Sequence, residues 1–169
     1  MTMVFETSKV IKSALNAQDI RCEIGEGPDS SAVITGFDLK SGDAATIHFI
    51  SAGERNDVAL RVFHFAKGEA GRLQSVVNDL NCKFRYAKFT LRGDEVCLEM
   101  DIPQETTDLG KVALELLYRS LDIMEHAAGD LKAAGAKLEP QSAPHGEPEA
   151  PSEPAPAPKK KFSLFGNGK

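Results

Sequence analysis

Two histidines and two cysteines are among the side chains of this sequence best suited to chemistry. His48 and His64 fall in neighbouring strand-like runs, and with Cys22 or Cys97 they could supply the nitrogen and sulfur ligands of a zinc site. No two of them are placed at ligand spacing within one element, which favours solvated or hydrogen-bonded histidines instead. The sequence therefore predicts neither a metal site nor another cofactor.

Glu99 and Asp101 form the most suggestive pair of carboxylates. They project to one face of a strand-like run, as a general acid and a general base would. We favour the alternative that they form the wet side of a hairpin and face Lys88 and Arg92 as cross-strand ion pairs. No nucleotide-binding loop, metalloprotease motif or nucleophile elbow occurs in the sequence. We therefore expect a protein that is not an enzyme.

The first half of the chain predicts a helix and four strands. Apolar residues recur at helical spacing within residues 5–16, and Thr7 or Ser8 could cap this helix. Runs with apolar residues at every second position follow, separated by short polar turns, within residues 19–25, 32–39, 45–50 and 58–65. Strands at this spacing predict an antiparallel meander.

The second half predicts a helix, a hairpin and a long helix. The first helix spans about residues 71–80, with Asn81 as its C-cap, and two strands then meet at a Gly93-Asp94 turn. The long helix runs to about Ala134, with Thr106 or Thr107 near its start and Asp108 at its positive end. The fold class is therefore α+β, in the order α-ββββ-α-ββ-α, with helices flanking a mainly antiparallel sheet.

Residues 78–103, "NDLNCKFRYAKFTLRGDEVCLEMDIP", also carry a family resemblance. In this stretch an Asn closes a helix, a strand with an aromatic residue and a Lys-Phe pair follows, and an acidic turn leads to a strand ending in an acidic residue, an apolar residue and Pro. The corresponding residues are Asn81, Tyr86, Lys88-Phe89, Gly93-Asp94-Glu95 and Asp101-Ile102-Pro103. The pattern resembles YbjN-type domains, described as bacterial sensory transduction regulators, over roughly residues 5–134. The resemblance implies a fold like that of type III secretion chaperones, often dimeric and without an active site.

Composition narrows the class of protein further. The chain of 169 residues has a net charge of −5, and residues 1–139 alone carry −6, which argues against a nucleic-acid partner. No apolar run approaches a membrane span, and the N-terminus lacks the features of a signal peptide. Three cysteines without a CxxC pair favour reduced thiols and a cytoplasmic protein.

The chain divides into a domain and a tail. We predict an α+β domain over residues 1–136, a disordered linker rich in Pro, Ala and Glu over 137–158, and a basic-aromatic peptide over 159–169. The peptide "KKKFSLF" is similar to the motif that binds the bacterial replication sliding clamp, although Lys161 stands where that motif has Gln. Attachment of its lysines to anionic membrane is a second explanation, and a disordered solubility tail is a third.

Binding surfaces are thus the main functional candidates. Six aromatic residues of the domain are either all core or partly exposed on one sheet face: Phe37, Phe49, Phe63, Phe65, Tyr86 and Phe89. The candidate partner-binding residues are Tyr86, Lys88, Arg92, Tyr118, Phe162, Leu164 and Phe165. The sequence predicts a non-enzymatic, cytoplasmic protein-binding module, chaperone-like or regulatory, that forms a homodimer. The alternative is an adaptor whose KKKFSLF peptide recruits a partner protein, such as the sliding clamp, or anionic membrane.

Overall fold

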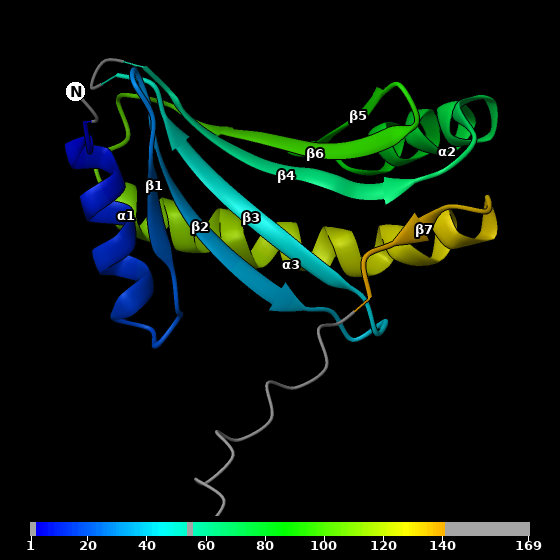
Figure 1. Cartoon of the computed structure of the whole chain (residues 1–169), viewed down its shortest axis with the longest axis horizontal. Helices are drawn as coiled ribbons and strands as arrows, with labels where there is room; N and C mark the ends of the chain where they lie inside the picture. The colour runs from blue at the N-terminus through cyan, green and yellow to red at the C-terminus, as the bar shows by residue number, and fades with distance from the viewer. Residues whose placement is uncertain (1–2, 54–55, 141–169) are drawn as a thin grey trace, which may run out of the picture.

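The computed structural model of the chain describes residues 3–53 and 56–140. Within these residues it shows an antiparallel sheet of seven strands flanked by three helices (Figure 1). The elements are α1 Glu6–Asn16, β1 Glu23–Glu26, β2 Ser31–Asp38, β3 Ala44–Ser51, β4 Val58–Lys67, α2 Ala70–Lys83, β5 Lys88–Arg92, β6 Glu95–Ile102, α3 Leu109–Ala133 and β7 Lys137–Leu138. The predicted α+β class and order are confirmed, and β7 is an additional strand.

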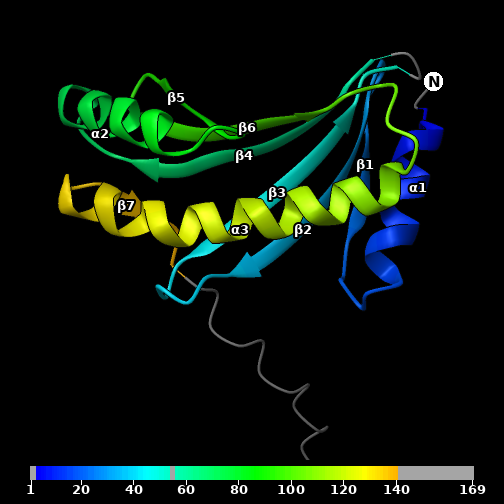
Figure 2. The same cartoon turned by 180° about the vertical axis from the view of Figure 1, so that it is seen from behind.

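The three helices lie on one face of the sheet. The strand order is β1-β2-β3-β4-β6-β5, and β7 pairs with β4. Seen from the helix side, α3 crosses the sheet lengthwise, α1 lies at the β1–β3 end and α2 at the β5–β6 end (Figure 2). The described residues place no helix on the opposite side, which we call the helix-free face.

Alternation along the strands sets which side chains form the core. Ala45, Ile47 and Phe49 of β3 are buried, as are Val96 and Leu98 of β6 and the next alternate residues along it. Because successive side chains of a strand point to opposite faces, every second residue meets the helices. Of the aromatic residues, Phe49, Phe65 and Phe89 are fully buried, Phe37 and Phe63 are half-buried, and Tyr86 is exposed.

Strands β3 and β4 diverge, and the chain after α3 fills the gap. They pair only between His48–Ile50 and Ala59–Arg61, and the register of β4 with β6 shifts between Val62 and Ala66. At this bulge His64 has a φ of 53°, a backbone conformation that residues other than glycine adopt rarely. β7 pairs with the freed edge of β4, and the N–H of Ala44 donates to the carbonyl of Glu139.

The predicted boundary at residue 136 therefore falls too early. Lys137–Leu138 form part of the sheet, and Pro140 forms an isolated bridge with Asp43. A two-residue strand is too short to show a periodic pattern. The predicted start of the linker therefore followed the composition of the Pro-, Ala- and Glu-rich segment after it. The rest of the predicted linker and the whole predicted peptide lie outside the described residues.

Two predicted helix caps are wrong. α1 begins after Phe5 with no side-chain cap. The Thr7 hydroxyl bonds instead to Ser51 of the sheet, and the Ser8 hydroxyl bonds to Ser31 and Ser51. The predicted position of Asp108 at the positive end of the long helix is confirmed, since Asp108 caps α3 and accepts a hydrogen bond from the N–H of Lys111.

Asn81 is not the C-cap of α2 either. The helix continues to Lys83, and Phe84 occupies the cap position. The Asn81 side chain instead bonds both backbone groups of Phe89: its amide donates to the carbonyl at 2.9 Å, and its oxygen accepts from the N–H at 2.7 Å. Asn81 thus ties α2 to the outer edge of β5.

Candidate binding surfaces

The carboxylates of β6 are engaged in ion pairs with neighbouring strands. Glu99 accepts hydrogen bonds from the Thr90 hydroxyl at 2.9 Å and from Arg92 at 2.8 Å, as the predicted cross-strand arrangement requires. Asp101 instead pairs with Arg61 of β4 at 2.8 Å. The side chain of Lys88 is exposed and makes no ion pair with the part of the chain that the structure describes. The prediction is thus right for Arg92 and wrong for Lys88.

These contacts hold Glu99 in its charged form. Burial raises the pKa of Glu99, but the hydrogen bonds from Thr90 and Arg92 and the positive charges of Arg61 and Arg92 outweigh burial. The pKa of this carboxyl therefore lies below its ordinary value. A carboxylate that stays ionised serves as a fixed acceptor in the sheet and does not suit the role of a general acid.

The rings of His48 and His64 both contact Phe63, that of His64 at 6.5 Å between ring centroids. The ring of His48 meets Phe63 edge-on at 5.3 Å, and burial lowers the pKa of His48. His64 Nδ1 lies 2.5 Å from a carboxylate oxygen of Glu95. Cys97 is buried, and half-buried Cys22 lies just before β1. Residues 3–53 and 56–140 contain no group of three His, Cys, Asp or Glu side chains placed to hold a metal ion.

The only two tyrosines of the sequence are both exposed. Tyr86, just before β5, is 72% exposed, and Tyr118 on α3 is 52% exposed. The guanidinium of Arg119 lies over the Tyr86 ring, 5.3 Å from its centroid, and also pairs with Glu115 one helical turn away. This contact brings residues of α3 beside the loop that leads into β5. We call Tyr86, Tyr118 and Arg119 the tyrosine surface.

The two outer edges of the sheet differ in their accessibility. At the β5 edge, Asn81 occupies the outward N–H and C=O groups of Phe89, so a further strand cannot pair there without displacing it. Exposed Lys88 and Arg92 add positive charge to this edge. β1 forms the opposite edge, with Glu23 and Glu26 exposed. The predicted residues Lys88 and Arg92 therefore lie at a protected edge of the sheet.

A large hollow lies between α1 and the start of α3. It has a volume of about 970 Å³ and is lined by Val10, Ala14 and Gly110 among others. Val10 is 40% exposed beside it, although the helical pattern predicts a buried side chain. Because a Cβ on Gly110 would lie 2.9 Å from that of Ala14, the two helices approach each other closely there. Nothing in the sequence pattern of either helix alone indicates this hollow.

Three smaller hollows form a continuous groove on the helix-free face. Their volumes are about 460, 230 and 210 Å³. The first two share Gly36 and Thr46, and the last two share Thr46 and Glu139. The groove runs from β1 across β2 and β3 to the gap beside β4. We call it the sheet groove.

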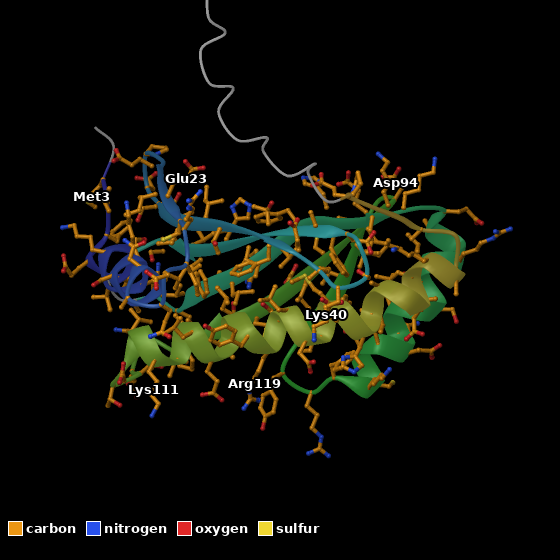
Figure 3. The ribbon with its side chains drawn as sticks, turned by 90° about the horizontal axis from the view of Figure 1, so that it is seen from below. Met3, Glu23, Lys40, Asp94, Lys111 and Arg119 are labelled. Carbon is orange, nitrogen blue, oxygen red and sulfur yellow. The ribbon has the colours of Figure 1, made fainter. Side chains whose placement is uncertain are left out.

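The tyrosine surface and the sheet groove lie on opposite sides of the molecule. Glu23 of the groove projects beside the strands, whereas Arg119 projects from α3 away from the sheet (Figure 3). The remaining predicted site residues, Phe162, Leu164 and Phe165, lie outside the described residues.

Comparison with known proteins finds no family model and no curated protein that matches this sequence. Among the helices of residues 3–53 and 56–140, none combines the length and apolar character needed to cross a lipid bilayer. The described surfaces therefore carry the functional argument.

Proposed function

We propose that this chain is a non-enzymatic, cytoplasmic protein-binding module of chaperone or regulator type that acts as a homodimer. The tyrosine surface is its main contact with partner proteins. The resemblance of residues 78–103 to YbjN-type domains supports the regulatory assignment. The acidic charge of residues 1–139 supports a protein partner over a nucleic acid.

The exposure of both tyrosines is the observation that carries this proposal. Tyrosine and arginine are enriched at the energetic centres of protein interfaces, because they offer a large contact area and a polar group at its end. At Tyr86 the ring is already held by a cation–π contact with Arg119, so ordering it on binding costs less entropy.

The ionisable side chains support a non-catalytic role. Glu99, Asp101 and Glu95 each pair with a basic side chain of a neighbouring strand. These pairs stabilise the sheet and commit each carboxylate to a structural contact.

Affinity capture with the full chain tests the proposal. We expect the Tyr86→Ala/Tyr118→Ala double variant to lose at least about tenfold in the amount of specific partner recovered, since interface hot spots typically contribute 1.4 kcal/mol or more. Met3→Ala is a matched control, because Met3 is also a large exposed apolar residue, at 53%, distant from Arg119 (Figure 3). Equal recovery by all three proteins would contradict the proposal.

The oligomeric state is tested separately by size-exclusion chromatography with light scattering. The mass of two chains is expected for the native protein. A single-chain mass over the whole concentration range would remove the homodimer from the proposal without affecting the role of the tyrosines.

A further inference from the structure

The sheet groove has an apolar floor with room for a side chain. Ile34 and Phe63 are half-buried there, although no helix covers them. Gly36 is exposed, and a Cβ built on it would meet nothing within 4 Å. A glycine in a strand leaves a bare patch of backbone that an aromatic ring can cover. Because burial favours neutral His48, the centre of the floor adds no fixed charge.

The rim of the groove is acidic. Glu23, Asp38 and Glu139 are exposed along it, and Arg21 is the only Lys or Arg among the residues that line its three hollows. None of the three acids forms an ion pair within the described part of the chain. The groove thus suits an occupant that combines apolar side chains with positive charge.

The described part of the chain ends at the groove itself. Glu139 and Pro140 line its central hollow, so the following residues start from its rim. Eighteen residues, 141–158, separate Pro140 from the segment KKKFSLF at 159–165. Eighteen residues can span at most about 60 Å, whereas the four strands β1 to β4 cover only about 15 Å from first to last at about 4.8 Å per step. The segment can therefore reach every part of the groove.

We propose that residues 159–165 of the same chain bind in the sheet groove. Phe162, Leu164 and Phe165 cover the floor around Gly36 and Ile34, and the lysines lie against the acidic rim. Tethering raises the effective concentration of the segment to the millimolar range, so a weak contact suffices for binding in cis. A second copy of this chain is a less suitable occupant, because docking groove against groove would bring two acidic rims together.

The sheet groove lies on the side of the molecule opposite the tyrosine surface, so binding of the peptide there is a property beyond the proposed function. The bound peptide would compete with partners, since a partner that binds either the groove or the C-terminal peptide must first separate the two. The peptide would then be available to a partner only when the groove releases it.

Backbone amide shifts of the full-length protein test the proposal by nuclear magnetic resonance. Replacing Phe162, Leu164 and Phe165 together by Ser leaves the folded domain unaltered and is expected to shift the amides of Ile34, Gly36 and Thr46. The control replaces Ala150, Ala155 and Ala157 by Ser and is expected to leave those amides unchanged. Equal spectra for both triple variants in the groove region would overturn the proposal.

A substitution in the groove provides the reciprocal test. Gly36→Thr places a Cβ where nothing lies within 4 Å, at a strand position that suits a β-branched residue. It is expected to return the amides of residues 162–165 to the positions they have in free peptide KKKFSLF. Unchanged positions of those amides would overturn the proposal.

Dilution separates binding in cis from binding between two chains. In cis the groove shifts stay constant on tenfold dilution, and a loss of these shifts on dilution would overturn the tethered arrangement. Shifts at residues 159–165 that arise only on adding phosphatidylserine vesicles would also overturn it, in favour of a membrane surface.

Discussion

The two halves of the sheet differ in how the charged side chains on the helix-free face are paired. On β6 each acidic side chain pairs with a basic side chain of β4 or β5, as Asp101 does with Arg61 and Glu99 with Arg92. On β1, β2 and β3, Glu23 and Asp38 make no ion pair with described residues and border a groove floored by Gly36. Acids that are already paired attract a basic ligand only weakly, whereas unpaired acids beside an apolar floor offer both attraction and contact area.

The halves nevertheless share one core, and the largest predicted effect tests this. Phe49 of β3 and Leu98 of β6 are both fully buried. Truncating either to Ala should lower the free energy of unfolding by about 3 to 5 kcal/mol, through lost burial and the cavity left behind. Urea unfolding followed by circular dichroism should show one transition for each variant. Two separate transitions would show instead that the halves unfold independently.

The protected β5 edge should depend on a single side chain. Asn81→Ala removes the partners of two Phe89 backbone groups, so we expect a loss of about 2 to 3 kcal/mol in the free energy of unfolding. Asn78→Ala is the control, because Asn78 is exposed on the same helix and its side chain accepts a hydrogen bond from Gln74. Comparable stability of the two variants in urea would mean that Asn81 does not secure this edge.

Residues 137–140, which link the two halves of the sheet, should contribute less to the free energy of unfolding than Asn81 does. A chain ending at Ala136 lacks β7 and the acceptor of the Ala44 N–H, and should be about 1 to 2 kcal/mol less stable than a chain ending at Pro140. Both chains lack the C-terminal peptide, so the comparison isolates residues 137–140. Coincident thermal unfolding curves would show that these residues do not hold β3 and β4 together.

The charge-paired half should lose stability in acid. Because the folded pKa of Glu99 is lowered, its contribution is fully present above the unfolded value, near 4.5, and is lost as the pH falls through the folded pKa. Glu99→Gln should therefore flatten the dependence of the unfolding free energy on pH below about 4.5. Glu6→Gln, an exposed carboxylate on α1, should leave it unaltered. A native-like slope in Glu99→Gln would contradict the assignment.

The free energy of unfolding should also depend on a group in the groove half, at higher pH and more weakly than on Glu99. Burial lowers the folded pKa of His48, so the unfolded chain binds its proton first and stability falls as the pH drops below about 6.5. The charged and titratable groups nearby are His64, Arg61 and Glu139. His48→Gln should remove this shallow slope below about pH 6.5, whereas His126→Gln, which keeps His48, should retain it. Chemical unfolding at half-unit pH steps provides the measurement.

The sequence predicted the secondary structure well because local periodicity reports local burial. Alternating Ala45, Ile47 and Phe49 could only form a strand with one face in the core, and the 25 residues of α3 gave a clear helical repeat. The Glu99–Arg92 pair was also identified, since side chains at every second position of a strand share a face. Each of these features depends on residues close together in the chain.

The sequence could not predict features that join distant segments. Asn81 had the position and residue type of a helix cap, but the approach of β5 gave its side chain two backbone partners that the helix end does not offer. Likewise Thr7 and Ser8 found hydroxyl partners on β2 and β3. Short polar side chains bond whichever backbone or hydroxyl group lies nearest, and folding decides which one that is.

By itself, then, the sequence determined the α+β class, the order of the predicted elements and which face of each strand is apolar, because these follow from the period of its side chains. Only the tertiary structure decided that β3 and β4 diverge, that residues 137–140 fill the gap, and that Gly36, Thr46 and Glu139 line one groove. These features depend on twist, register and packing between strands, which no repeat along a single segment encodes.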